Sequence, residues 1–365
     1  MKVALVYDRV NKWGGAERVL LALHKIFPKA PLYTSVYEPV KTSWASVFTI
    51  HTSLLQKFSF TRTHHEYFGT FMPFLFERFN FDTYDLVISI TSEAAKGIIT
   101  RGKTKHICIC LTPTRYLWSG FDVYFANPLL RMIALPATAY LRWWDKNAAK
   151  RPDVYIAISQ EVQRRIKEYY KQDSIVIYPP ITLKNYKVRP SKEKGYFLVV
   201  SRLVSYKRID LAIKACNTLQ VPLKIIGTGS EEAYLRSIAG KTVEFLGNLT
   251  DEEVVQYYMH SAALLFPGLE DLGLTILEAQ KLGKPVIAFK GGGALETITE
   301  GKTGTFFFPQ TELALTKKLQ YLLKSRKIII GQTKSYYTKF CHERKEQFSE
   351  DTFVKNIQAF LSEYL

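Results

Sequence analysis

Short apolar runs along the chain alternate with segments in which apolar residues recur every three or four positions. In the first half, residues 2–7, 85–90, 106–111 and 153–159 form runs suited to buried strands. Residues 16–27 have helical spacing, with a common apolar face made of Val19, Leu20, Leu23, Ile26 and Phe27. This alternation predicts parallel sheets that are covered by helices.

The same pattern starts again in the second half of the chain. Helical spacing appears at residues 209–219, 251–260 and 275–283, and apolar runs predict strands at residues 196–202, 223–229, 243–248, 262–268 and 285–293. Between the halves, residues 184–195 are polar and basic and have no periodicity, which is typical of a linker.

We therefore expect an α/β chain of two doubly wound, Rossmann-like domains, residues 1–183 and 184–345, that face each other across a cleft. Residues 346–365 read as one amphipathic helix that we expect to pack back toward the first domain. Sheets of this kind bind ligands beyond the carboxyl ends of their strands, so we expect the function to lie in the cleft.

Length, composition and charge exclude several classes of protein. The 365 residues are 47% hydrophobic, which is enough for two folded cores and argues against disorder. The net charge of +17 favours a polyanionic partner, which is nucleic acid, an anionic membrane or a phosphorylated small molecule. The cysteines lack the companion ligands of a zinc site, so we expect buried thiols at Cys108, Cys110, Cys216 and Cys341.

Two apolar segments bear on the localisation. The first run, residues 3–7, is too short for a signal peptide. The most apolar later stretch, residues 127–144, is interrupted by Arg131, Pro136 and Arg142, so it falls short of the roughly 20 residues that span a bilayer. These features predict a cytoplasmic protein without a membrane span.

The segment 268–285 places two acids, Glu270 and Glu278, on either side of Gly273. Free N–H groups at a helix start attract phosphate oxygens, and nearby carboxylates accept hydrogen bonds from sugar hydroxyls. The combination favours a phosphorylated, polyhydroxylated ligand. Each part also has a structural alternative, since Thr275 and Glu278 fit a capping box and Glu270 alone fits a solvated loop.

Other residues after predicted strands fit the same ligand. Arg202 and Lys207 follow the strand at 196–202 and are suited to neutralise a diphosphate, although isolated residues of this kind are often surface charges. Gly14 and Gly15 lie between the first strand and helix, where a ligand can approach the backbone. Neither they nor Gly227 complete a dinucleotide or P-loop motif.

With these motifs in order, the chain resembles retaining glycosyltransferases of family 4, which have the two-domain GT-B architecture. The segments that carry the resemblance are GGAERV, TPTRYLW, SRLVSYKRID, EDLGLTILEA, KPVIAFKGGGALETI and TGTFFFPQT. Within the family it is most similar to bacterial mannosyltransferases of O-antigen and polysaccharide assembly that use GDP-mannose. The resemblance implies transfer of a hexosyl unit, mannose first, to a lipid-linked or polysaccharide acceptor.

The resemblance also assigns roles. Glu278 would bind the donor ribose and Glu270 the hydroxyls of the transferred sugar, while Arg202 and Lys207 would hold the diphosphate and stabilise it as it leaves. The donor site would be completed by backbone at Gly14, Gly15, Gly227, Gly273, Leu274 and Thr275. The sequence has no D-x-D motif, and we expect no metal or other cofactor.

One position departs from the family pattern. Leu111 stands just before TPTRYLW, where a histidine that contacts the sugar is expected, and leucine makes no hydrogen bond through its side chain. This leaves the donor sugar open and keeps a weakened or non-catalytic binding protein as an alternative. Arg115, Tyr116 and Trp118 remain as sugar or acceptor contacts, or else as a packed structural loop.

Two further features favour an anionic membrane at the inner face of the plasma membrane. Residues 60–79 are rich in phenylalanine, with His64, His65 and arginines, although a core-facing helix is the alternative that we prefer for them. A basic group, alternatively a solvated face, comprises Arg142, Lys146, Lys150, Arg151, Arg164, Arg165, Lys167 and Lys171. No nucleic-acid recognition module is visible, so we expect no nucleic-acid partner. A UDP-sugar donor stays open, because a carboxylate on ribose does not distinguish the base.

Overall fold

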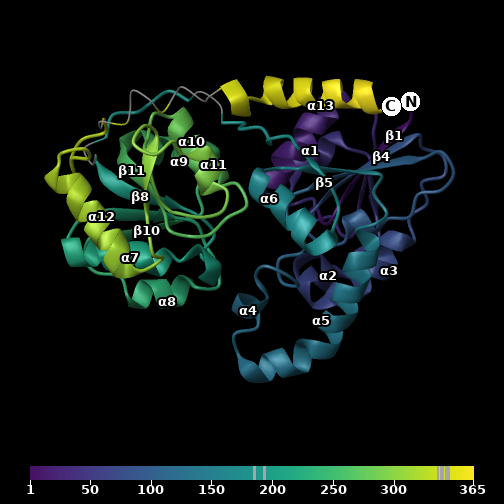
Figure 1. The fold of residues 1–365 in the computed structure, drawn as a ribbon, viewed down its shortest axis with the longest axis horizontal. Coiled ribbons are helices and arrows are strands. Elements are labelled where there is room, and N and C mark those ends of the chain that lie inside the picture. Colours follow the sequence, from purple (N-terminus) through teal and green to yellow (C-terminus); the bar gives the residue numbers. More distant parts are fainter. Residues whose placement is uncertain (184–185, 192–194, 335–336, 338–340, 342–345) are drawn as a thin grey trace. The chain divides into compact units, whose positions relative to one another are not determined.

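The computed structural model describes residues 1–365 except 184–185, 192–194, 335–336, 338–340 and 342–345, and it leaves out the side chains at 63 and 66. The chain divides into two compact units (Figure 1), one made of Met1–Pro180 with Glu350–Leu365 and the other of Ile181–Ser349. The predicted linker, residues 184–195, lies partly outside the described residues.

The first unit is built on a parallel sheet of seven strands in the order β3-β2-β1-β4-β5-β6-β7. Four of these strands are runs that the apolar pattern predicts, namely β1 (Val3–Tyr7), β4 (Leu86–Thr91), β5 (Lys105–Cys110) and β6 (Val154–Ala157). The other three are two or three residues long, too short to leave a periodic signal: β2 (Leu32–Thr34), β3 (Ile50–Thr52) and β7 (Ile175–Val176).

Helices connect and cover these strands. They are α1 (Gly15–Ile26), α2 (Ser59–Thr63), α3 (Met72–Glu77), α4 (Phe121–Tyr124), α5 (Pro128–Ala148), α6 (Gln160–Arg165) and α13 (Glu350–Tyr364). Short 3-10 segments are η1 (Ser43–Val47), η2 (Leu54–Lys57), η3 (His65–Phe71) and η4 (Ala95–Gly97), and the π-helical turn η5 (Ile166–Tyr170) continues α6.

The C-terminal helix α13 packs in the first unit although it follows the second unit in sequence. It runs along α1 (Figure 1), and the Lys25 ammonium lies 2.7 Å from the Glu350 carboxylate. Phe353, Ile357 and Leu361 repeat at helical spacing and are buried in the core that also holds β1 and α1. The apolar face of α13 therefore completes the first hydrophobic core.

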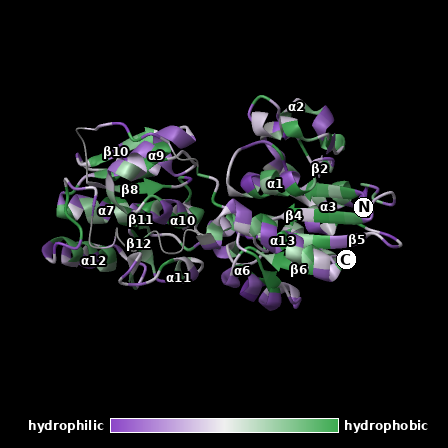
Figure 2. Ribbon diagram, turned by 90° about the horizontal axis from the view of Figure 1, so that it is seen from above, coloured by the Kyte–Doolittle hydropathy of each residue, from purple (hydrophilic) through white to green (hydrophobic). Residues whose placement is uncertain are grey.

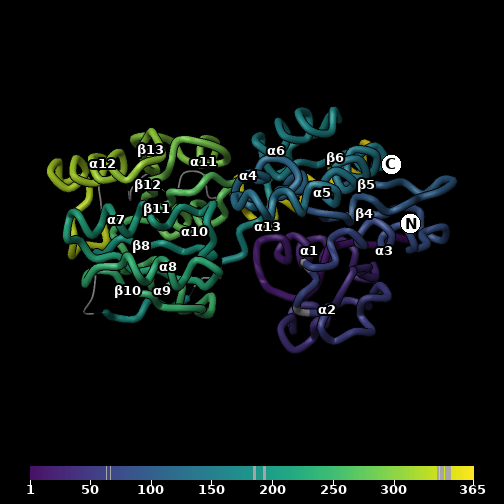
Figure 3. The backbone as a smooth tube through the Cα atoms, turned by 90° about the horizontal axis from the view of Figure 1, so that it is seen from below, coloured from purple at the N-terminus to yellow at the C-terminus, as the bar shows by residue number. Residues whose placement is uncertain are grey.

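The second unit has a six-stranded parallel sheet in the order β10-β9-β8-β11-β12-β13, which can be followed in Figure 3. Its strands are β8 (Tyr196–Val200), β9 (Leu223–Ile226), β10 (Val243–Gly247), β11 (Ser261–Phe266), β12 (Val286–Phe289) and β13 (Gly304–Phe307). The helices are α7 (Ile209–Leu219), α8 (Glu232–Ser237), α9 (Asp251–His260), α10 (Leu274–Lys281), α11 (Ala294–Thr297) and α12 (Glu312–Lys324), with short turns η6 (Ser205–Lys207) and η7 (Glu346–Phe348).

Each sheet has an apolar core on both faces. In the second unit, the α7 and α12 face is packed around Phe197, Leu223 and Ile225, and the α9 and α10 face around Leu198, Leu264 and Ile276. The strands are coloured hydrophobic in Figure 2, while the helices alternate between hydrophobic and hydrophilic sides. This burial on two faces explains why the strands read as continuous apolar runs rather than alternating ones.

Candidate functional site

The strand order of the second unit changes direction between β8 and β11. From β8 the chain proceeds to β9 and β10 on one side, and from β11 to β12 and β13 on the other. Loops after two such neighbours leave the carboxyl edge in opposite directions and open a crevice, which is where doubly wound sheets bind ligands. Arg202 and Lys207 follow β8, and Glu270 and Gly273 follow β11, so the topology brings these four predicted residues to one edge.

The basic and acidic side chains at this edge contact one another. The Lys207 ammonium forms an ion pair with the Glu270 carboxylate, and both side chains are mostly buried. The Arg202 guanidinium donates a hydrogen bond of 2.7 Å to the Tyr206 hydroxyl, and the Lys207 nitrogen lies 5.2 Å from the centre of the Tyr206 ring. Tyr206, which the sequence reading missed, thus holds the two predicted diphosphate-binding cations beside each other.

Helix α10 begins at this edge. Its N-cap is Gly273 with φ of 82°, a left-handed conformation that favours glycine. The structural alternative, a capping box, is wrong, because Thr275 lies inside the helix and no side chain caps its start at Gly273. A helix start leaves its first N–H groups without partners inside the helix, so the N–H groups of Leu274 and Thr275 are suited to an anion.

Glu278 lies one turn into α10 and is buried, with 7% of its surface exposed. The Tyr258 hydroxyl, on α9, donates to the Glu278 carboxylate across 3.3 Å. A buried carboxylate needs hydrogen-bond donors to offset its desolvation. The site therefore presents two acids in different settings, Glu278 buried in the helix and Glu270 on the loop before it.

The glycine-rich loop 291–293 supports Glu270. The Gly293 N–H donates to the Glu270 carbonyl across 2.9 Å. A side chain at Gly292, which has φ of 57°, would place its Cβ 2.3 Å from the same carbonyl. The glycines of this loop are therefore required by close backbone packing that sets the position of Glu270.

The remaining predicted glycines lie at other strand ends. Gly227 follows β9, and its N–H bonds to the carbonyl of Gly247 across 2.8 Å. Gly14 and Gly15 begin α1 in the first unit. There the buried Glu17, in the first turn, accepts a hydrogen bond of 2.6 Å from the Tyr7 hydroxyl. The start of α1 thus already carries a carboxylate, while the start of α10 has no acid in its first turn.

In the first unit, the loop 112–118 follows β5 at the carboxyl edge. Leu111 is half-buried and packs on the core around β1 and α1. Trp118 stacks on Tyr169, with ring centres 5.3 Å apart, and donates a hydrogen bond of 2.7 Å to the Asp145 carboxylate. Trp118 therefore has a structural role in fixing this loop, as the alternative interpretation expected.

A buried ion pair that the sequence reading missed lies behind the loop. The Lys96 ammonium and the Asp145 carboxylate are 2.6 Å apart, with side chains 1% and 2% exposed. Burial opposes charge on Lys96, but the carboxylate of Asp145 outweighs it and raises the lysine pKa. Asp145 also accepts a hydrogen bond of 3.0 Å from the Thr114 hydroxyl. In the sequence, the one sign of this pair is a lysine within an apolar segment after β4. Sequence alone does not distinguish such a lysine from one at the surface.

A second polar cluster lies where the first sheet changes direction, between β1 and β4. The Asp8 carboxylate accepts backbone hydrogen bonds of 2.7, 3.0 and 2.8 Å from Ser92, Glu93 and Ala95, and so holds the turn after β4. The Arg9 guanidinium lies 2.6 Å from the Glu93 carboxylate. Burial raises the pKa of Tyr116, and the charge of Glu93 raises it further, so this phenol stays protonated near the cluster.

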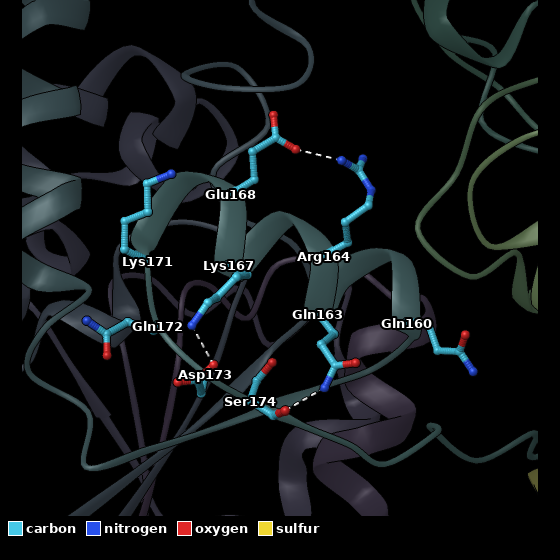
Figure 4. Close-up of a pocket in the computed structure, with 9 residues that line it drawn as sticks. All are labelled: Gln160, Gln163, Arg164, Lys167, Glu168, Lys171, Gln172, Asp173 and Ser174. Carbon is cyan, nitrogen blue, oxygen red and sulfur yellow. Dashed lines mark hydrogen bonds and ion pairs between the residues drawn. The ribbon is translucent and has the colours of Figure 1, made fainter.

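The basic group predicted from the sequence is divided in the structure. Arg164 and Arg165 pair with Glu161, Arg164 also pairs with Glu168, and Lys167 lies 2.7 Å from Asp173. Of these residues, Arg164, Lys167, Glu168 and Asp173 border a pocket of about 580 Å³ along α6 and η5 (Figure 4). Pairing with acids removes most of the charge that an anionic surface would attract.

The four cysteines are free and buried, as predicted. Burial raises the pKa of Cys108 and of Cys216 to about 12, so both thiols are protonated at neutral pH. Among the described residues, no helix combines the length and the apolar character needed to cross a membrane.

Comparison with known proteins finds similarity mainly in the second unit. Residues 181–333 match the family model described as glycosyl transferases group 1. The chain is 24% identical over 252 residues to the O-antigen chain mannosyltransferase C of Escherichia coli, covering 64% of each chain. It is 36% identical over 115 residues to a GDP-mannose-dependent monoacylated alpha-(1-6)-phosphatidylinositol monomannoside mannosyltransferase of Corynebacterium glutamicum, covering 27% of this chain and 30% of that one. The matches to the first relatives span 56% to 66% of their length.

Solved structures extend the likeness to the whole fold. The HepE protein of Anabaena, in complex with UDP-glucose, matches over 100% of both chains with a TM-score of 0.72 and 20% identity. At this identity the likeness establishes the fold alone. The chain therefore has the GT-B fold of two parallel α/β domains, and its residues 181–333 match the family model of the group 1 glycosyl transferases.

Proposed function

We propose that the chain is a retaining glycosyltransferase that transfers a hexosyl unit, mannose from GDP-mannose, to a lipid-linked or polysaccharide acceptor. The observation that carries the proposal is the cluster at the carboxyl edge of the second sheet. There Arg202, Lys207 and Glu270 lie beside the start of α10, within the segment that matches the family model. Cations, a helix start and carboxylates together match the chemistry of a nucleotide sugar.

Each group has a distinct task in this proposal. Arg202 and Lys207 bind the diphosphate, together with the N–H groups of Leu274 and Thr275, and stabilise the negative charge that grows as the sugar departs. Glu270 accepts hydrogen bonds from the sugar hydroxyls. Lys207 already pairs with Glu270. Its ammonium has three N–H donors, so it can donate to the Glu270 carboxylate and to a phosphate oxygen at the same time.

Glu278 is suited to the ribose. Two hydroxyls on adjacent carbons satisfy both oxygens of one carboxylate, and Tyr258 keeps that carboxylate in position from the side of α9. These protein charges provide the electrostatic stabilisation of the diphosphate, so the proposal includes no resident metal or other cofactor. Activity that persists in excess chelator is the expected result, and loss of activity would contradict this part.

In the first unit, Gly14 and Gly15 are proposed to approach the donor, and Arg115, Tyr116 and Trp118 to contact the sugar or the acceptor. Tyr116 is the most suitable of the three, since its protonated hydroxyl can donate to a sugar oxygen and Trp118 is already engaged by Asp145. Closure around both substrates would exclude water and limit hydrolysis of the donor.

Two alternatives concern the donor and the turnover. Similarity to relatives named as mannosyltransferases supports mannose. A UDP-sugar stays the alternative, because a carboxylate on ribose does not distinguish the base. The apolar packing of Leu111 supports a weakened or non-catalytic nucleotide-sugar-binding protein, because a leucine side chain forms no hydrogen bond where the family pattern has a histidine. In either case the cluster of the second unit still binds a nucleotide diphosphate.

Isothermal titration with GDP-mannose, GDP, UDP-glucose and UDP tests the proposal. We expect GDP-mannose and GDP to bind, and Lys207→Ala to weaken binding about ten- to hundredfold, the effect of losing a charged hydrogen bond. Glu278→Gln should weaken binding of the nucleotide as well. Lys302→Ala is the matched control, because Lys302 is an exposed lysine in a turn of the same unit.

The possible outcomes separate the alternatives. Selective binding of UDP compounds would keep the glycosyltransferase and replace the donor. Binding without transfer to any acceptor and without slow hydrolysis would favour the non-catalytic protein. Absence of binding by all four compounds would reject the proposed site.

A further inference from the structure

Helix α4 and the first half of α5 expose an unusual amount of apolar surface. Leu129, Met132 and Ile133 are 61%, 62% and 67% exposed. We define the α4–α5 apolar surface as the exposed side chains of Val123, Tyr124, Leu129, Leu130, Met132, Ile133 and Leu135. In the view of Figure 1, these turns extend away from the sheet of the first unit. The rest of that unit leaves them uncovered.

The two halves of α5 differ in burial. In the second half, Leu141, Trp144 and Ala148 are buried against the body of the first unit at ordinary helical spacing. In the first half, Leu129, Leu130, Met132 and Ile133 lie within one arc of about 160° around the helix, since successive residues are turned by about 100°. An apolar face this broad is normally covered, and its exposure here marks a candidate interaction surface.

The exposed half is a formed structure and not a frayed end. The Asn127 side chain accepts hydrogen bonds of 2.9 and 3.2 Å from the N–H groups of Leu129 and Leu130, and Pro128 occupies the first turn. The Arg131 guanidinium lies 3.1 Å from the Asp122 carboxylate of α4. Helices α4 and α5 are thus attached to each other.

Phe121 fixes this pair of helices to the loop 112–118. The guanidinium carbons of Arg131 and Arg142 lie 5.0 and 4.2 Å from the centre of the Phe121 ring. Arg142 also donates a hydrogen bond of 2.7 Å to the carbonyl of Leu117. The Tyr124 ring lies 6.4 Å from the ring of Tyr116, the residue proposed to contact sugar or acceptor. The apolar surface is therefore continuous with the strand-end loop.

The charge along α5 and the turn after it is mostly positive. The basic residues of α5 and of the turn after it are Arg131, Arg142, Lys146, Lys150 and Arg151. The acid of this segment, Asp145, is 2% exposed and pairs with Lys96, Asp122 of α4 pairs with Arg131, and Arg151 pairs with Glu77. Arg142, Lys146 and Lys150 are the cations relevant to a membrane surface. An apolar element bordered by cations complements an anionic bilayer, in which apolar side chains enter the acyl boundary and cations bind lipid headgroups.

We propose that the α4–α5 apolar surface inserts into the interface of an anionic lipid bilayer. Leu129, Leu130, Met132 and Ile133 enter the acyl boundary, and Arg142, Lys146 and Lys150 lie at the headgroups. The site differs from the segment 60–79 and from the α6 cations, whose pairing with acids leaves little free charge. It does not depend on which nucleotide sugar the second unit binds, or on turnover.

Co-sedimentation with vesicles tests this proposal with the full chain. We expect binding to vesicles of phosphatidylglycerol and phosphatidylethanolamine, and much weaker binding to phosphatidylcholine alone. The double variant L129S/I133S should lower the vesicle partition coefficient at least tenfold. L313S is the matched control, because Leu313 on α12 is 63% exposed yet lies in the other unit. K146Q/K150Q should weaken binding most at low salt.

Three results would overturn the proposal: no binding of the unmodified protein to anionic vesicles, equal binding by L129S/I133S, or a dimer that this variant converts to monomers. The last result would identify a second copy of the chain as the partner of this surface. Thermal unfolding of L129S/I133S checks that the first unit stays folded, which its exposed positions predict. Titration of the same variant with GDP-mannose separates failure of this proposal from failure of the proposed function.

Discussion

The buried pair of Lys96 and Asp145 gives a stability prediction that can be worked from the structure. The side chains are 1% and 2% exposed, and their charged atoms are 2.6 Å apart. Substitution Asp145→Asn keeps the size of the side chain and an oxygen that can accept from Trp118. It removes the negative charge, and so leaves the Lys96 ammonium buried without its counter-charge.

Removal of one partner from a buried ion pair costs about 3 to 5 kcal/mol in free energy of unfolding. A domain is stable by about 5 to 15 kcal/mol, so Asp145→Asn should remove a large share of the stability of the first unit. The double variant K96M/D145N has no unmatched charge and an apolar side chain at position 96. It should recover most of the loss, because replacing both charges of such a pair is often nearly neutral.

The chain offers a selective probe for this experiment. All 5 tryptophans, Trp13, Trp44, Trp118, Trp143 and Trp144, lie in the first unit. Urea unfolding followed by tryptophan fluorescence therefore reports on that unit, while circular dichroism reports on both. A double-mutant cycle of the unmodified chain, K96M, D145N and K96M/D145N measures the coupling between the two side chains.

Two results would refute this reasoning. A loss of less than about 1 kcal/mol in D145N would mean that water or rearrangement compensates the charge, contrary to the burial on which the argument rests. A double variant as unstable as the sum of the single ones would mean that the pair does not act as a pair. In that case the role of Asp145 would be limited to its hydrogen bonds with Thr114 and Trp118.

Three further predictions use other parts of the chain. Gly292→Ala should weaken binding of GDP-mannose at least tenfold, because the new Cβ meets the Glu270 carbonyl at 2.3 Å, whereas Gly301→Ala, also at positive φ but in open space, should leave binding unchanged. Burial, together with the charge of Arg151, lowers the pKa of His106 from 6.5 to about 3, so between these values only the unfolded chain takes up the proton. The first unit should therefore lose about 2 kcal/mol between neutral pH and pH 5 through this group, a loss that His106→Gln should remove. The buried cysteines should not react with a thiol reagent until the protein unfolds.

Each has a contradicting outcome. Equal donor binding by the two glycine variants would show that loop 291–293 does not position Glu270. The same pH dependence of urea unfolding with and without His106 would place the titrating group elsewhere. Labelling of Cys108 or Cys216 in the native protein would show that the sheets open locally.

The strands and helices that the sequence predicts are those with an uninterrupted pattern. Strands β1, β4 and β5 and helices α7 and α9 are continuous or strongly periodic segments, and they form where the pattern places them. Strands β2 and β3 have three residues each and gain stability from neighbours in the sheet, which periodicity does not report. The alternative of a capping box at Thr275 is wrong because the backbone turn at Gly273 starts the helix before Thr275.

In the candidate site, too, the sequence predicts some features and the strand order decides others. Residue types and their position after apolar runs were enough to select Arg202, Lys207, Glu270 and Glu278, because ligand-binding groups of parallel sheets follow strand ends. The contacts of Tyr206 and Tyr258 with these residues depend on which strands are neighbours, and only the order of the strands in the sheet decides that.

The sequence by itself determined two parallel sheets, the helices that cover them, and the chemistry of the loops after the strands. These features follow from the local periodicity of apolar residues and from residue type. The tertiary structure alone decided that Lys96 and Asp145 form a buried pair. It also decided that the first half of α5 stays uncovered. Whether a charge is buried or a leucine is exposed depends on residues far away in the sequence. No local pattern shows which of these residues pack against a given side chain.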